Sequence, residues 1–235
     1  MGVVVLLGCW TAGKSSTVRR LEQKYPGKFR AIDTDSCVAE SFAGWIYNIY
    51  LALVDGANVN PAADYIEWRE RCLLTKLLDV REPCLIAAGP MVPTREPIWS
   101  AFINHIKPTC IYLSLSPEEV YDGLSLRRLR QCKNGLDLVQ NFGSWDKDLC
   151  TQFDPTTGLW EVLNRDDSLA CIEAQMSSLT TRYKRVIPGH RTYSASRLKW
   201  DRELQDSIDE VLAYHLGIEN EPVVGDYLGL HAVAS

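Results

Sequence analysis

Short apolar runs and amphipathic stretches alternate along the chain, with turn residues between them. Continuous apolar runs at 2–7, 84–88 and 109–115 predict strands covered on both faces, and 28–33 and 191–196 predict two further short strands. Apolar positions near helical spacing predict helices over 14–24, 37–54, 62–80, 95–106, 117–131, 168–186 and 200–216. The stretch 133–166, with scattered Gly, Pro and aromatic residues, predicts no regular element.

This alternation of strands and helices predicts the α/β class. We expect a three-layer α/β/α fold, with a parallel sheet of about five strands and helices on both faces. Ligands of such sheets bind beyond the carboxyl ends of the strands. We expect one domain over 1–217, in which 133–180 is a lid or an inserted helical region, and a loosely ordered tail over 218–235.

Composition narrows the class of protein. The net charge is −5 and no block of Lys and Arg stands out, which argues against nucleic acid as a partner. No apolar run reaches the roughly 18 residues of a membrane span, and the first residues lack the features of a signal peptide. The eight cysteines form no C-x-x-C pair, which indicates free thiols in a reducing compartment. We therefore expect a cytoplasmic protein, monomeric or homodimeric, away from membranes.

The strongest chemical signal is GCWTAGKS at residues 8–15, which matches G-x-x-x-x-G-K-[ST] in full. Glycines let successive backbone N–H groups face phosphate oxygens, and the helix that follows directs its positive end at the same anion. Lys14 is expected to reach the β- and γ-phosphates, and the Ser15 hydroxyl to ligate Mg²⁺. The pattern predicts an ATP and Mg²⁺ site at Gly8, Thr11, Ala12, Gly13, Lys14, Ser15 and Ser16. Trp10 either projects toward a second substrate or packs inside.

Other motifs narrow the kind of nucleotide-binding protein. The base-reading N-K-x-D of GTPases is absent, and the apolar runs at 84–88 and 109–115 do not end in the aspartate of motor and transport ATPases. Acids at a strand end occur in Asp33-Thr34-Asp35, soon after the phosphate loop, as in small kinases. Either acid could instead cap a helix start.

These pieces together resemble the shikimate kinase family, within the wider group of small P-loop kinases that includes adenylate and gluconate kinases. Asp33-Thr34-Asp35 is similar to that family's D-[ST]-D, and WRER at 68–71 to its substrate-binding helix. AAGP at 87–90 is similar to its glycine-rich turn, and YLSLSPEE at 112–119 to the strand and helix start before its lid. Arginines at 127, 128 and 130 fall where lid arginines are expected. The resemblance covers roughly residues 1–131.

The resemblance implies a role for each matched residue. Asp33 would help to hold Mg²⁺, and Asp35 would face the acceptor hydroxyl as a base or orienting group. Arg69 and Gly89 would contact the acceptor, since arginine suits bidentate recognition of an anion. Arg128 would cover the phosphoryl group during transfer. Arg69 and the lid arginines could instead be solvated helix charges.

The resemblance therefore implies ATP-dependent phosphoryl transfer to a hydroxyl of a small molecule. Cys72 stands where the family has a glutamate, and Thr180 where it has a second substrate arginine. These departures predict an acceptor other than shikimate. A nucleotide or nucleoside kinase and an antibiotic phosphotransferase are alternatives within the enzyme class. A nucleotide-binding regulator that transfers no phosphate is the alternative from another class.

Overall fold

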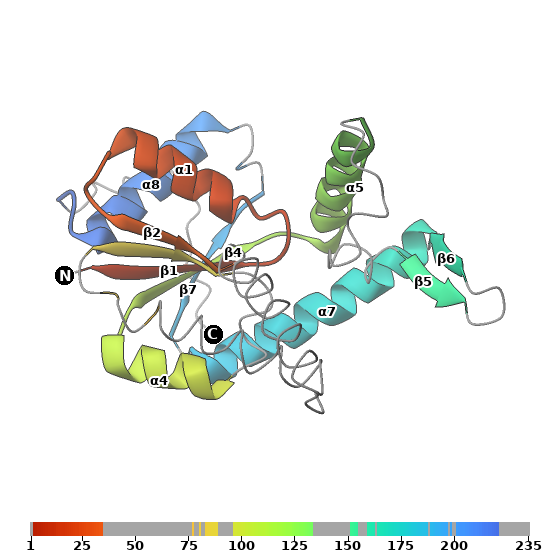
Figure 1. Cartoon of the computed structure of the whole chain (residues 1–235), viewed down its shortest axis with the longest axis horizontal. Helices are drawn as coiled ribbons and strands as arrows, with labels where there is room; N and C mark the ends of the chain where they lie inside the picture. Colours follow the sequence, from red (N-terminus) through yellow and green to blue (C-terminus); the bar gives the residue numbers. More distant parts are fainter. Residues whose placement is uncertain are drawn as a thin grey trace, which may run out of the picture.

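A five-stranded sheet, parallel throughout, forms the centre of the structure (Figure 1). Its strand order is β2-β3-β1-β4-β7. The strands are β1 Val3–Gly8, β2 Arg30–Asp33, β3 Cys84–Ala87, β4 Thr109–Ser114 and β7 Arg191–Ser194. The computed structural model describes residues 2–34, 77, 80, 83–88, 96–133, 151–154, 159–162, 164–187, 189–196, 198 and 201–220.

Helices cover both faces of this sheet (Figure 1). One face carries α1 and α8, and the other carries α4 and α7. Helix α5 follows β4 beyond the carboxyl ends of the strands. The described helices are α1 Lys14–Lys24, α4 Glu96–Ile106, α5 Pro117–Lys133, α7 Arg165–Val186 and α8 Arg202–Leu216. The predicted three-layer α/β/α fold with five parallel strands is confirmed.

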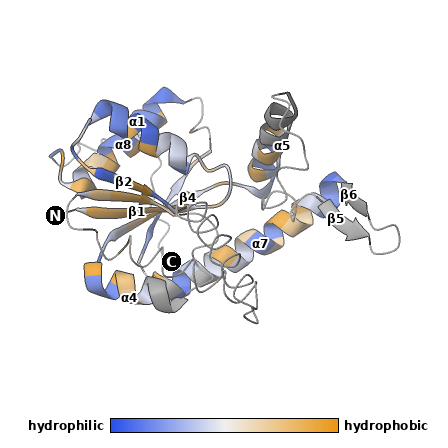
Figure 2. Cartoon of the chain, viewed as in Figure 1, coloured by the Kyte–Doolittle hydropathy of each residue, from blue (hydrophilic) through white to orange (hydrophobic). Residues whose placement is uncertain are grey.

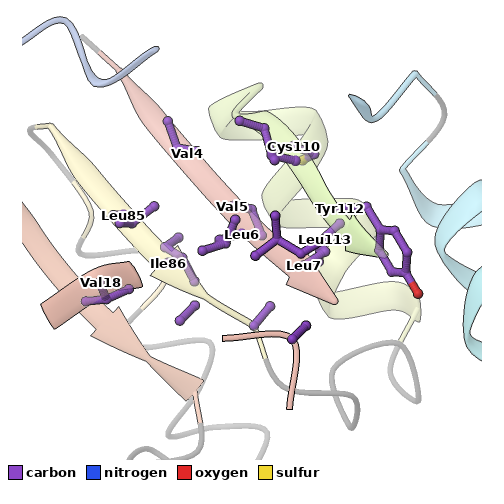
Figure 3. Close-up of a cluster of buried hydrophobic side chains, with 14 of the residues drawn as sticks. Val4, Val5, Leu6, Leu7, Val18, Leu85, Ile86, Cys110, Tyr112 and Leu113 are labelled. Atoms are coloured by element: carbon purple, nitrogen blue, oxygen red, sulfur yellow. The ribbon is translucent and has the colours of Figure 1, made fainter. Parts of the chain in front are cut away.

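Strand β1 lies in the middle of the core. It pairs with β3 on one side and β4 on the other, and Val4, Val5, Leu6 and Leu7 are fully buried. Side chains from β3, β4 and α1 surround it (Figure 3). Fully burying one such side chain contributes about 1.5–3 kcal/mol, so β1 holds a fixed position from which the segment after Gly8 leaves the sheet.

The stretch 133–166, expected to be irregular, contains a hairpin instead. Strands β5 Thr151–Asp154 and β6 Leu159–Val162 pair antiparallel at the outer end of α7 (Figure 1). The register sets Phe153 opposite Trp160. Cross-strand aromatic pairs favour hairpins, so the aromatic residues of this stretch were a signal of the element, although a weak one because the strands are only four residues long.

Helix α7 also begins earlier than the predicted residue 168. Asn164 is its N-cap, and its side-chain oxygen accepts a hydrogen bond of 2.9 Å from the backbone N–H of Asp167. The negative charges of Asp166 and Asp167 in the first turn interact favourably with the positive end of the helix dipole. The expected helices 37–54 and 62–80 lie outside the described residues apart from Leu77 and Val80, as does the expected tail beyond residue 220.

A buried ion pair joins α1 to α8. Arg20 donates from Nε and Nη2 to the two carboxylate oxygens of Asp209, at 2.6 and 2.7 Å. The Asp209 side chain is 1% exposed and that of Arg20 is 25% exposed. Burial raises the pKa of the Asp209 carboxyl, and the Arg20 guanidinium opposes this rise. The pair therefore gives a buried carboxyl a charged hydrogen-bond partner and holds α1 against α8.

Within the described part of the chain, no helix combines the length and the hydropathy that crossing a bilayer requires.

We predict that Arg20→Met lowers the free energy of unfolding by about 3 kcal/mol near neutral pH, because it leaves a buried carboxylate unpaired. Without Arg20 the raised pKa of Asp209 rises further, so protonation relieves the loss as the pH falls toward the carboxyl's unfolded value. Urea unfolding at about pH 7.5 and about pH 5 measures this difference.

The double variant Arg20→Met/Asp209→Leu is the control. Replacing both charges by apolar groups leaves nothing unpaired, so the double variant is expected to be more stable than Arg20→Met alone. Two results together would contradict a coupled buried pair. Arg20→Met would lose the same free energy of unfolding at both pH values, and the loss in the double variant would equal the sum of the losses in its two single variants.

Candidate functional site

The segment between β1 and α1 curls because glycines stand at two of its positions. Gly8 ends β1 with a φ of 154°, and a Cβ there would lie 2.8 Å from the carbonyl oxygen of Leu113. Gly13 caps α1 in the left-handed region, with a φ of 85°. Thr11, between them, also has a positive φ, of 61°. The loop therefore brings its backbone to the N-terminal end of α1, where free helix N–H groups and the helix dipole favour an anion.

Lys14 lies back over this loop. Its ammonium donates hydrogen bonds to the backbone oxygens of Gly8 and Cys9, at 2.9 and 2.8 Å. The loop's own carbonyls thus hold the charge at the loop, half-buried and close to the start of α1. No acidic residue occupies the first turn of α1. Lys14 and the positive end of α1 therefore favour an anion bound at the loop.

Ser15 and Asp33 meet beside the loop. The Ser15 hydroxyl, in the first turn of α1, donates to Asp33 Oδ2 at 3.0 Å. Asp33 is the last residue of β2 and pairs with Ala87 of β3. Ala87 in turn pairs with Leu6 of β1. Strands β2 and β3 thus end level with Leu6, and β1 continues two residues further, to Gly8. Asp33 is separated from β1 by a whole strand and still reaches the start of α1.

Thr34 anchors the chain where it leaves β2. Its hydroxyl, 3% exposed, donates to the carbonyl oxygen of Ala87 at 3.2 Å. The residue after β3, Ala88, donates its backbone N–H to Leu6 at 2.9 Å. The ends of β2, β3 and β1 are therefore held together by hydrogen bonds just where Asp33 faces Ser15.

This arrangement suits Mg²⁺ and a nucleotide phosphate. A serine hydroxyl and a carboxylate are the hard oxygen ligands that Mg²⁺ takes, with phosphate oxygens and water completing its octahedron. No group of three or more His, Cys, Asp or Glu side chains gathers among the described residues, and a magnesium site of this kind needs none. The cationic Lys14 and the start of α1 lie on the same loop.

Two further segments border the loop. The segment from β4 into α5 runs along it, since Leu113 lies against Gly8 and Gly123 lies against Thr11. After β7, the buried Leu198 lies over the loop's end, where a Cβ at Gly13 would be 3.6 Å from its Cδ2. Sequence reasoning missed both contacts, because pattern and motif do not report packing between distant segments.

The two bordering segments are joined to each other. Ser116 and Glu119 cap α5 reciprocally: the Ser116 N–H donates to the carboxylate at 2.8 Å, and the Glu119 N–H donates to the hydroxyl at 3.3 Å. Ser196, after β7, donates its hydroxyl to the other carboxylate oxygen of Glu119. The predicted helix start at Ser116 is thus also the tie between α5 and the β7 segment.

The predicted site residues divide into two sets. The structure brings the phosphate-loop residues and Asp33 together at one edge of the sheet. Asp35, Arg69 and Gly89 lie outside the described residues, as does the side chain of Arg128, whose backbone belongs to α5. The predicted residues that the structure places in the loop and the first turn of α1 are Gly8, Thr11, Ala12, Gly13, Lys14, Ser15 and Ser16.

Cys9 and Trp10 are buried inside the loop. Trp10 is 8% exposed and belongs to the core, so of its two predicted roles the packing role holds. Cys9 is fully buried; burial raises the pKa of its thiol, and Lys14 opposes this rise. The four cysteines whose side chains the structure describes, at positions 9, 84, 110 and 171, are free.

Thr180 of α7 turns to the sheet. It hydrogen-bonds the hydroxyl of Tyr112 on β4, whose pKa burial raises to about 12. Tyr183, one turn later, is 1% exposed, with its ring centroid 5.5 Å from that of Tyr112. This part of α7 is therefore occupied with packing on β4.

Comparison with known proteins bears on the fold. No protein-family model matches the sequence, and no curated protein matches it. A shikimate kinase from Bacteroides thetaiotaomicron superposes with a TM-score of 0.54, at 18% identity over 92% of this chain and 98% of that chain. This chain has the fold of a shikimate kinase. The resemblance predicted from the sequence is thus confirmed at the level of the fold.

Two further solved structures match with lower TM-scores. A shikimate kinase from Acinetobacter baumannii, in complex with shikimate, gives a TM-score of 0.48 at 16% identity, over 90% of this chain and 93% of that chain. A gluconokinase from Sinorhizobium meliloti 1021 gives 0.46 at 13% identity, over 92% and 91%.

We predict that Gly8→Ala lowers the free energy of unfolding by about 3 kcal/mol, because the new Cβ meets a backbone carbonyl at 2.8 Å in a conformation that side chains disfavour. The matched control is Gly27→Ala, where φ is also positive, at 69°, and nothing lies within 4 Å of the new Cβ. That control should lose only about 1 kcal/mol, from backbone strain. Equal losses in urea unfolding would contradict the close approach of Leu113.

Proposed function

We propose that this chain transfers a phosphoryl group from ATP to a hydroxyl of a small molecule, with Mg²⁺. The observation that carries the proposal is the 3.0 Å contact between Ser15 Oγ and Asp33 Oδ2, beside a glycine-curled loop that holds Lys14. A loop alone would support nucleotide binding. A carboxylate brought from a second strand to the metal-binding serine supports chemistry at the phosphate.

Each group of the loop has a task in this proposal. Backbone N–H groups of the loop and the start of α1 hold the phosphates, and Lys14 neutralises charge on the β- and γ-phosphates. Ser15 and Asp33 hold the Mg²⁺, Asp33 mostly through water. When bound, Mg²⁺ and ATP supply the activated phosphoryl group and screen its oxygens. The protein's contribution is positioning and charge neutralisation, which dominate catalysis of phosphoryl transfer.

The acceptor side rests on residues beyond the described part of the chain. In the sequence Asp35 follows Thr34, whose hydroxyl is hydrogen-bonded to Ala87. We assign to it the proton of the acceptor hydroxyl. We assign acceptor contacts to Arg69 and Gly89, and to Arg128 the charge that develops on the transferring group.

We propose an acceptor other than shikimate. By the sequence resemblance, Cys72 and Thr180 stand at two positions where the shikimate kinase family has charged residues that bind the substrate. Thr180 is neutral and is hydrogen-bonded to Tyr112, which supports a packing role and leaves no cation there for a carboxylate. A small molecule with a hydroxyl but without that carboxylate is the acceptor class that fits.

The test is an ADP-release assay with Mg²⁺ and ATP, against a panel of shikimate, gluconate, nucleosides and aminoglycosides. We predict acceptor-dependent ADP release that Lys14→Ala abolishes and that Lys28→Ala leaves intact. Lys28 is an exposed lysine after α1, away from the loop. Its replacement by alanine removes the same charge as Lys14→Ala does, so it is the matched control. Binding of ATP without turnover on any compound would contradict the kinase proposal and favour a regulator that binds nucleotide.

With an acceptor identified, Asp35→Asn tests the assigned base. The amide keeps the size of the side chain but cannot take the acceptor's proton, so turnover should fall by about 10²–10⁴-fold. The affinity for ATP should stay within about twofold, since a general base contributes to the chemical step and not to nucleotide binding. Unchanged turnover would remove the role of Asp35.

A further inference from the structure

Helix α5 touches the phosphate loop at a glycine. Gly123 is buried, and a Cβ there would lie 2.5 Å from Thr11 Oγ1, 2.7 Å from its Cβ and 2.9 Å from its Cγ2. All three distances are shorter than side-chain contacts allow. Any residue other than glycine at position 123 must therefore separate the helix from the loop.

Thr11 is itself an unusual residue for its place. It has a φ of 61°, where a β-branched residue is strained, and its hydroxyl is buried without a hydrogen-bond partner among the described residues. Glycine would relieve the strain and asparagine would tolerate it. The side chain that is present is the one that fills the space against Gly123.

The rest of this border is rigid. The segment before α5 lies against Gly8 through Leu113, and the start of α5 is held by the reciprocal cap of Ser116 and Glu119. From Gly123 the helix continues to Lys133, through the positions of the three lid arginines. A displacement at Gly123 is thus carried to those positions by the helix backbone.

We propose that Gly123 is a positioning residue: its contact with Thr11 sets α5, and the arginines that α5 carries, relative to the phosphate loop. The inference rests on the proposed function, because it assigns the arginines to the phosphoryl group. Occupation of the loop by phosphates holds Thr11 in place, and through this contact α5 becomes less mobile. Catalysis then depends on a helix–loop distance that only glycine permits.

The first test is kinetic, with Gly123→Ala. Alanine favours helix over glycine, so the change is benign for α5 itself, and a loss must come from the contact. We expect kcat to fall by about tenfold or more, because a displacement of about an ångström in a positioning group has such effects. The Kd for ADP should change by less than about threefold, since the backbone of the loop binds it.

Two further variants isolate the contact. Asp122→Ala, at the exposed neighbouring position, makes a similar change in helix preference without facing the loop, and is the matched control. Thr11→Gly removes all three crowding atoms and accepts the positive φ. The double variant Thr11→Gly/Gly123→Ala should therefore have the kcat of Thr11→Gly alone, within about threefold.

The second readout needs no turnover. Hydrogen exchange of the amides in 117–126 should slow when Mg²⁺-ADP binds the wild-type chain and Asp122→Ala, and should not slow in Gly123→Ala. Equal protection in all three proteins would overturn the inference even if the chain proved not to be a kinase. Kinetic losses equal to those of Asp122→Ala, or a double variant as impaired as the product of its singles, would also overturn it.

Discussion

The site depends on where β1 ends. Four consecutive side chains of this strand are fully buried between β3 and β4, so the strand cannot shift without exposing the core (Figure 3). At Gly8 the chain leaves the sheet against the Leu113 carbonyl, where a side chain has no room. The loop and the start of α1 thus inherit the rigidity of the core, which a site for phosphoryl transfer requires.

Other contacts keep the two sides of the loop in register. The buried ion pair between Arg20 and Asp209 fixes α1 to α8. Hydrophilic residues are frequent along these two helices, whereas the strands beneath them are mostly hydrophobic (Figure 2). Thr34 ties the end of β2 to β3, which brings Asp33 to Ser15. These are hydrogen bonds between segments far apart in the sequence, and those of Thr34 and Ser15 lie at the carboxyl edge of the sheet. The buried strands supply rigidity, and the polar contacts supply the alignment.

Local signals were sufficient for most of the fold. Apolar runs bounded by turn residues identified three of the five strands, and the alternation along the chain placed the two short ones at 28–33 and 191–196. The glycines and lysine of residues 8–15 identified the loop, because their spacing encodes its backbone conformation. The hairpin of β5 and β6 was missed, since its strands are short and its pattern is weak. The contacts of Gly123 with Thr11, and of Glu119 with Ser196, were beyond prediction. They depend on how α5 packs on the loop, which no local pattern encodes.

We propose that Ser15 and Asp33 form a metal site beside the loop. The affinity for ATP, measured with and without Mg²⁺, tests this most directly. Titration calorimetry of the wild-type chain and of Asp33→Asn gives both values. We predict that Mg²⁺ tightens ATP binding to the wild-type chain and that Asp33→Asn loses most of this gain. Metal-free binding of ATP to Asp33→Asn should be unchanged or tighter, because a negative charge is removed. An equal effect of Mg²⁺ on the two proteins would contradict it.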